Sequence, residues 1–126
     1  MKGALLAILL AAGPAHAFDV PSGQPVELQE VLIDTVEAET WLRFRFIAPA
    51  IAREAGTIDY QTAAEDMMFL CESFALSYIA DYALTGEVIV ISLADRETEF
   101  GTADPDATQF FEAFRAEGEA CIWEGL

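Results

Sequence analysis

The sequence is poor in the side chains on which many enzymes depend. Its one lysine, Lys2, and its one histidine, His16, both lie within the first 17 residues. A chain without that segment cannot build a Ser-His-Asp or Cys-His catalytic arrangement, a histidine-containing zinc site or a lysine Schiff base. The motifs G-x-S-x-G, G-x-G-x-x-G and G-x-x-x-x-G-K-[ST] are also missing. The chain therefore lacks the sequence signatures of a hydrolase nucleophile elbow, of a dinucleotide-binding site and of a nucleotide-phosphate loop.

The first 17 residues have the features of a secretory signal peptide. Lys2 gives a positive start, residues 4–12 form an apolar run, and Ala15-His16-Ala17 matches the A-x-A site of signal peptidase. The run is well short of the roughly 20 residues that span a bilayer, which disfavours a membrane anchor. We therefore expect a signal peptide at 1–17 that is cleaved after Ala17, and a protein that is periplasmic or secreted without membrane insertion.

Removal of this leader leaves residues 18–126 strongly acidic. Five arginine residues stand against all 22 acidic residues, so five minus 22 gives a formal charge of −17. Binding of phosphates depends on clustered Lys and Arg, so we expect no nucleic-acid partner. The acidic surface either suits salty surroundings, where charges are screened within about 8 Å, or faces a basic partner or cations; the first interpretation is favoured. The length and the evenly spread apolar residues predict a single ordered domain.

Cysteine is scarce as well. Cys71 and Cys121 are the only two in the chain, and an even number in an oxidising compartment predicts one disulfide. A bridge that closes a loop of about 50 residues would remove unfolded-state entropy worth ~4 kcal/mol in the chain-entropy model. A redox-active pair is the alternative, but such pairs are usually a C-x-x-C at the start of a helix. A structural disulfide is therefore favoured.

Residue periodicity predicts an α+β domain. Apolar residues that alternate or run continuously predict five strands, at 26–33, 41–47, 88–93, 98–101 and 119–124. A 3.6-residue apolar period over 64–82 predicts a long helix, capped by Asp59 or Thr62 and ended by Gly86. The Asp104-Pro105 pair predicts the start of a short second helix that ends near Gly118 and carries Phe110, Phe111 and Phe114. We expect a mostly antiparallel sheet covered on one side by one long and one short helix.

Two sets of side chains are candidates for a functional site. Arg43 and Arg45 project from one face of their strand and could hold a carboxylate or sulfate, although pairing with the chain's own acids is favoured. A run of carboxylates could share acid and base roles or bind calcium; its members are Asp95, Glu97, Glu99, Asp104 and Asp106. Spacing is a weak signal among 22 acidic residues, and a turn at Asp95 and a helix cap at Asp104 are the favoured interpretations.

Aromatic residues could also line a ligand cleft. At strand or helix spacing they are expected mostly in the core; they are Trp41, Tyr78, Tyr82, Phe110, Phe111, Phe114 and Trp123.

Several stretches of the chain are distinctive in combination. They are Pro21-Ser-Gly-Gln-Pro25, Glu39-Thr-Trp-Leu-Arg-Phe-Arg-Phe46, Phe69-Leu-Cys-Glu72, Val90-Ile-Ser-Leu-Ala-Asp-Arg96, Glu99-Phe-Gly101, Thr108-Gln-Phe-Phe-Glu112 and Cys121-Ile-Trp-Glu124. Together they resemble a small family of exported alphaproteobacterial proteins of unknown function, which implies no activity and no functional residues. Some similar sequences are named acetolactate synthase. That enzyme is a much longer cytosolic chain that binds thiamine diphosphate through a Gly-Asp-Gly motif with a downstream Asn and magnesium, features that this sequence lacks.

The sequence predicts function only coarsely. We expect an exported, non-catalytic domain without a cofactor that binds a protein or an envelope component through its surface. The alternative is a small carboxylate-based enzyme or a calcium-binding protein that uses the acids between 95 and 106. Convergent acids with raised pKa values in a concave pocket would favour the alternative, whereas scattered acids and an exposed apolar patch would favour binding.

Overall fold

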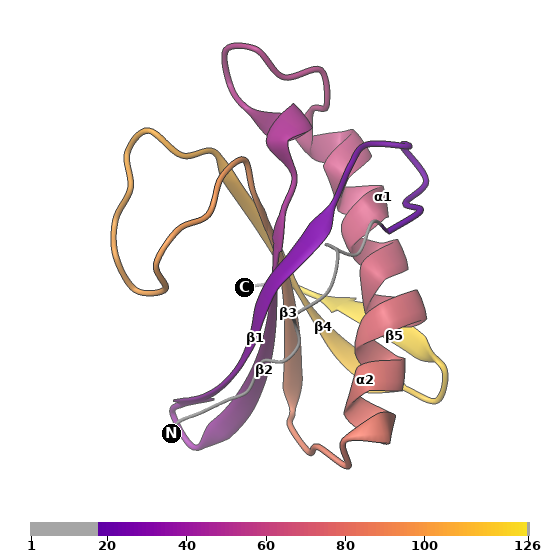
Figure 1. Cartoon of the computed structure of the whole chain (residues 1–126). Helices are drawn as coiled ribbons and strands as arrows, with labels where there is room; N and C mark the ends of the chain where they lie inside the picture. The colour runs from indigo at the N-terminus through magenta and orange to yellow at the C-terminus, as the bar shows by residue number, and fades with distance from the viewer. Residues whose placement is uncertain (1–17, 126) are drawn as a thin grey trace.

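One helical segment crosses one face of a five-stranded sheet in the computed structural model, which describes residues 18–125 (Figure 1). The predicted signal peptide lies outside these residues. The strands are β1 (Glu27–Val36), β2 (Glu39–Ile47), β3 (Val88–Ala94), β4 (Gln109–Glu117) and β5 (Ala120–Glu124). A short 3-10 turn, η2 (Pro49–Ile51), follows β2. The helical segment consists of α1 (Tyr60–Leu70), a π-helical turn η3 (Cys71–Ala75) and α2 (Leu76–Asp81).

The sheet is mixed, with its strands in the order β1-β2-β3-β4-β5. Three neighbouring pairs are antiparallel, whereas β2 and β3 are parallel. A parallel pair needs a long crossover connection, and the helical segment supplies it between β2 and β3. The predicted α+β class and the number of strands are confirmed, but the parallel pair was not predicted.

Residues 104–118 do not form the predicted second helix. Asp104 opens a turn, in which its carbonyl accepts from the Ala107 N–H at 3.1 Å, and β4 begins at Gln109. A spacing of four residues, as between Phe110 and Phe114, fits one face of a helix and one face of a strand equally well. The residues from Gln109 to Phe114 pair with β3, so this segment is a strand. The predicted strand at 98–101 is likewise wrong, because this segment belongs to the loop between β3 and β4.

The helical segment begins at a predicted cap. The Asp59 carboxylate accepts from the Thr62 N–H at 2.9 Å, and this hydrogen bond lowers the pKa of Asp59. The segment ends before the predicted Gly86, because Ala83 adopts a φ of 53° and so stops the helix after Asp81. Gly86 instead packs against β2, where an added Cβ would lie 2.8 Å from Leu42 Cγ.

The main hydrophobic core lies between the helical segment and the sheet. From β2 it receives Leu42, Phe44 and Phe46, each at most 1% exposed. Phe74 lies edge-to-face against the rings of Phe44 and Phe46, at centroid distances of 6.1 and 6.0 Å, a preferred geometry for aromatic pairs. Cys71 and Cys121 form a disulfide that joins η3 to β5, with their Cα atoms 6.3 Å apart.

The segment before β1 is fastened to α1 by a buried carboxylate. Asp66 accepts from the Ser22 N–H at 2.9 Å, the Ser22 hydroxyl at 2.6 Å and the Gln24 side-chain amide at 2.7 Å. A buried carboxylate with several donors is well satisfied. The Pro-Ser-Gly-Gln-Pro stretch is therefore part of the folded domain.

Candidate functional site

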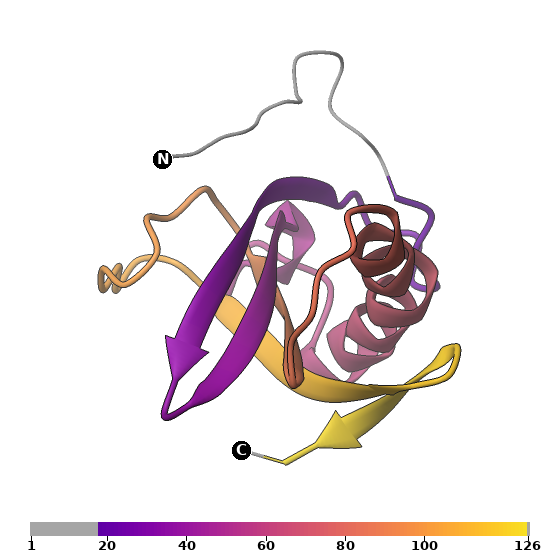
Figure 2. The same ribbon diagram turned by 90° about the horizontal axis from the view of Figure 1, so that it is seen from below.

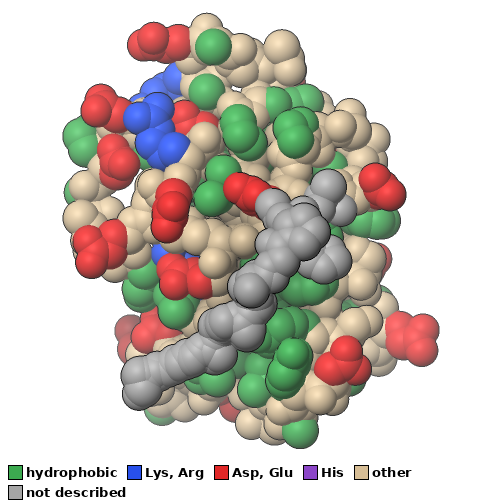
Figure 3. Space-filling model, in the orientation of Figure 1, with side chains coloured by type: hydrophobic (Ala, Val, Ile, Leu, Met, Phe, Trp, Pro, Cys, Tyr) green, Lys and Arg blue, Asp and Glu red, His purple; other side chains and the backbone are tan. Residues whose placement is uncertain are grey.

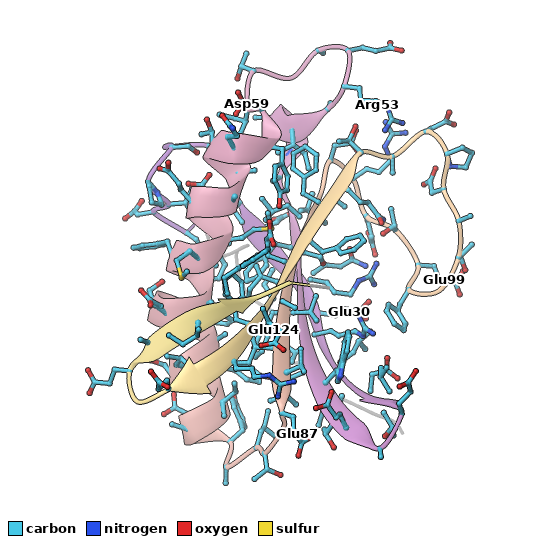
Figure 4. All side chains as sticks on the ribbon, turned by 180° about the vertical axis from the view of Figure 1, so that it is seen from behind. Glu30, Arg53, Asp59, Glu87, Glu99 and Glu124 are labelled. Atoms are coloured by element: carbon cyan, nitrogen blue, oxygen red, sulfur yellow. A yellow bond between two sulfur atoms is a disulfide. The ribbon has the colours of Figure 1, made fainter. Side chains whose placement is uncertain are left out.

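The sheet face away from the helix carries a loop in place of a helix. Residues 95–108 connect β3 to β4 and extend outward from the sheet, on the side opposite the helical segment (Figure 2). Beneath the loop lie side chains of β2 that alternate with the core residues, Arg43 and Arg45 among them. Glu30 of β1 and Glu99 of the loop lie on this same side of the sheet (Figure 4).

Arg43 forms an ion pair and contacts two aromatic rings. Its Nε donates to one carboxylate oxygen of Asp34 at 3.0 Å, and its Nη2 lies 3.0 Å from the same oxygen. Its guanidinium carbon lies 5.1 Å from the ring centroids of both Trp41 and Phe100, within the range of cation–π attraction. Arg43 therefore connects β1, β2 and the loop.

Arg45 holds the loop more directly. It donates to the Glu30 carboxylate, to the Thr98 carbonyl at 3.2 Å and to Thr98 Oγ1 at 2.9 Å. Its guanidinium also lies 5.5 Å from the Phe100 ring centroid. Arg43 and Arg45 thus both pair with acids of the chain, the arrangement that the sequence favoured.

Thr98 is the point at which the loop is attached to the sheet. This residue is only 5% exposed. Besides Arg45, it accepts from Gln29 Nε2 at its carbonyl, at 2.8 Å, and from Gln109 Nε2 at Oγ1, at 3.0 Å. Side chains from β1, β2 and β4 therefore converge on one loop residue and attach the loop to the sheet.

A cleft of about 390 Å³ opens between the loop and the sheet, a size typical of small-molecule sites. Its walls include Gln29, Arg43, Ser92, Glu99, Gln109 and Phe111. Phe100 and Phe111 border it and are 45% and 58% exposed. A second hollow adjoins it, shares Gln29, Glu99 and Phe100 with it, and is also lined by Glu30 and Glu97.

The predicted carboxylate cluster divides into two parts. Asp95, Asp104 and Asp106 surround Arg96, whose pKa they raise, chiefly through the hydrogen bond from Arg96 to Asp95. Glu97 and Glu99 lie instead beside the second hollow. No group of three or more His, Cys, Asp or Glu residues within 18–125 is arranged to hold a metal ion.

Asp95 closes the base of the loop. Its carboxylate, in a side chain only 4% exposed, accepts from the Thr108 N–H at 2.9 Å, and its own N–H donates to the Thr108 carbonyl at 3.0 Å. Burial raises the pKa of Asp95, but hydrogen bonds from Arg96 and Thr108 outweigh burial and leave the pKa lowered. A lowered pKa suits a structural anion and not a general acid.

The expectation that the aromatic residues singled out from the sequence lie mostly in the core is met only in part, because Tyr82, Phe111 and Trp123 are 65%, 58% and 60% exposed. Phe111 lines the cleft, whereas Phe114 is 1% exposed in the core. Residues that sequence reasoning missed are Gln29, Ser92, Thr98, Phe100 and Gln109. The one available signal was Phe100 beside Gly101, an exposed aromatic within an otherwise acidic and polar loop.

The disulfide between Cys71 and Cys121 is consistent with the predicted export, because disulfides persist in oxidising compartments. Within residues 18–125, no helix has the length and apolar character needed to cross a membrane. A family of unknown function, DUF6497, matches residues 4–126 of the chain. No curated protein matches the chain, and no solved structure matches it.

Proposed function

We propose that this chain, which belongs to DUF6497, a family of unknown function, binds a protein partner of the cell envelope without catalysis. The interaction surface is the face of the sheet opposite the helical segment, here called the helix-free face, with the cleft beneath the 95–108 loop at its centre. One observation carries this proposal. The loop is fixed by Arg45, Gln29 and Gln109 in a conformation that leaves Phe100 and Phe111 half exposed beside the cleft.

Preorganisation supports a binding role. A loop that is already ordered loses little conformational freedom when a partner docks, so more of the contact free energy remains as affinity. Half-exposed aromatic side chains are enriched at protein interfaces, where they supply contact area at low entropic cost. The acids of the loop are divided between the surroundings of Arg96 and the second hollow. They do not converge on one point, as a carboxylate-based enzyme or a calcium site would require.

Affinity capture from an envelope fraction tests the proposal. The processed protein is compared with Phe111→Ala and with Tyr82→Ala, a control that removes another exposed aromatic side chain, this one at the end of the helical segment. We expect one envelope protein to be retained by the wild type and the control and lost with Phe111→Ala. Equal retention by all three proteins, or capture of nothing above background, would contradict the proposal.

Export is tested separately. Mass spectrometry of the native protein is expected to show Phe18 as its first residue. A chain that retains residues 1–17 and is located in the cytoplasm would exclude an extracytoplasmic role. The calcium alternative is tested by calorimetric titration after treatment with a chelator, where heat of binding and a raised melting temperature would support it.

A further inference from the structure

The cleft presents hydrogen-bond acceptors that the protein does not use. Gln29 Nε2 donates to the Thr98 carbonyl and Gln109 Nε2 donates to Thr98 Oγ1. A carbonyl can only accept, which fixes the orientation of the Gln29 amide and turns its oxygen away from Thr98. The oxygens of Gln29 and Gln109 are not among the buried unpaired atoms of residues 18–125. For the half-buried Gln29 this means that its oxygen is an accessible acceptor, and Gln109 is an exposed residue that lines the same cleft.

The positive charges of the cleft are already neutralised. Arg43 pairs with Asp34, Arg45 pairs with Glu30, and both guanidinium groups lie against the ring of Phe100. An anionic ligand would have to compete with these carboxylates. It would also approach a domain with a formal charge of −17, which repels anions over the screening length of about 8–10 Å.

The remaining charge in and beside the cleft is negative. Glu99 lines the cleft and makes one long contact, from Thr102 Oγ1 at 3.3 Å. Glu97 lines the adjoining hollow. Every arginine within residues 18–125 already contacts a carboxylate or a carbonyl of the chain, through Asp34, Glu30, Pro105, Asp95, Glu39 and Glu124. Figure 3 shows acidic side chains spread over one face of the molecule, with basic groups gathered in a small area beside them.

Phe111 adds an exposed aromatic ring to these acceptors. It is 58% exposed and lies opposite Ser92 in the pairing of β4 with β3. An aromatic face attracts a cation, and guanidinium groups stack on such faces more often than ammonium groups. Guanidinium also offers five N–H donors in a planar fork, which suits several fixed acceptors, whereas ammonium is a compact point charge with three donors.

We infer that the cleft beneath the 95–108 loop receives an arginine side chain from a basic segment of the partner protein. The guanidinium stacks on Phe111 and donates to Glu99 and to the oxygens of Gln29 and Gln109. This inference rests on the proposed function, because it names the chemistry of the partner that the helix-free face binds.

The test uses the processed protein and three short probes. Each probe is an acetylated and amidated Gly-Ser peptide that contains one arginine, one lysine or one citrulline. NMR spectroscopy follows the side-chain amide signals of Gln29 and Gln109 during titration. We expect saturable shifts with the arginine peptide, binding about fivefold weaker with lysine, and no saturation with citrulline, which keeps the shape of arginine but lacks its charge.

A charge-matched pair of variants separates the cleft from the general acidic field. Glu99→Gln and Glu119→Gln each remove one negative charge, and Glu119 lies in the turn between β4 and β5. We expect Glu99→Gln to weaken binding of the arginine peptide at least fivefold, roughly the effect of one lost charge-assisted hydrogen bond, and Glu119→Gln to change it less than about twofold.

Equal weakening by the two variants would overturn the inference, since it would mean non-specific attraction to the acidic surface. Equal binding of the arginine and citrulline peptides would overturn it as well. Phe111-dependent capture of an envelope protein that is unaffected by Glu99→Gln would leave the proposed function standing and the arginine inference refuted. The two ideas can therefore fail independently.

Discussion

Strand β2 contributes side chains to both faces of the sheet, but these side chains make different kinds of contact on the two faces. Towards the helical segment, Leu42, Phe44 and Phe46 pack into an apolar core. Towards the loop, Arg43 and Arg45 form ion pairs and support Phe100. Close apolar packing resists any change of volume, whereas solvent-accessible ion pairs contribute little to stability. Most of the apolar core therefore lies on one face, whereas the other carries only a small buried cluster of Val88, Val90 and Ala113 beside its ion pairs and leaves room for a recognition surface.

The largest expected effect comes from two neighbouring residues on opposite faces. Phe44→Ala removes a ring that is 0% exposed and is expected to lower the free energy of unfolding by about 3–5 kcal/mol. Arg43→Met keeps most of the side-chain volume and loses the Asp34 ion pair and the cation–π contacts with Trp41 and Phe100, for an expected loss of about 1–2 kcal/mol. Urea denaturation measures both. Losses of equal size would remove the contrast between the two faces.

The disulfide is expected to have the next largest effect. It joins η3 to the edge strand β5 across 50 residues of sequence. The double variant Cys71→Ser, Cys121→Ser is expected to lose about 2–4 kcal/mol, because the unfolded chain regains conformational freedom. Denaturation of the wild type with and without reductant provides the control, since the variant should be unaffected by reductant. A wild type that is also unaffected would show that the bridge does not stabilise the fold.

A smaller and more local effect is expected at the loop attachment. Thr98→Val removes Oγ1, which accepts from Arg45 and Gln109, and should cost about 1–2 kcal/mol. Amide hydrogen exchange should also accelerate in residues 99–103. Thr102→Val is the matched control, because its hydroxyl makes a single long contact with Glu99. Equal exchange rates in the two variants would mean that Thr98 does not hold the loop.

Local sequence patterns predicted strand β2 better than strand β4. Alternation from Trp41 to Ile47 placed Phe44 in the core and Arg43 opposite it, because the two-residue period of a strand is visible in a short window. The same reasoning failed at Phe110 and Phe114, whose spacing suits two periods. The parallel pairing of β2 with β3 depends on contacts between distant segments, so no local pattern signals it.

For the same reason, local sequence patterns could predict only part of the candidate site. Arg43 and Arg45 share a face because they are two residues apart, and this part was predictable. Gln29, Thr98 and Gln109 come from three separate segments and meet only through the sheet order. Their residue types are ordinary for exposed positions, so their sequence context gives no sign of a shared role.

The smallest expected effect is on how the stability of the fold depends on acidic pH, and it arises from Asp95 on the open face. The folded protein lowers the pKa of Asp95, which means that folding favours the ionised carboxylate relative to the unfolded chain, where the pKa is about 3.9. The contribution of Asp95 is therefore fully present above that pH and is lost as the pH falls through the folded-state pKa. Because Arg96 is half exposed, we expect this contribution to be below about 1 kcal/mol.

Asp95→Asn should therefore lose less stability than the wild type when the pH is lowered from 5 to 3, as measured by urea denaturation at each pH. Asp81→Asn removes the same charge from the exposed end of α2, away from the loop, and should follow the wild type. If Asp95→Asn also follows the wild type, the acid sensitivity of the domain does not arise at the base of the loop. Hydrogen exchange at Thr108 distinguishes this case, because only a working Asp95 anchor protects that amide at neutral pH.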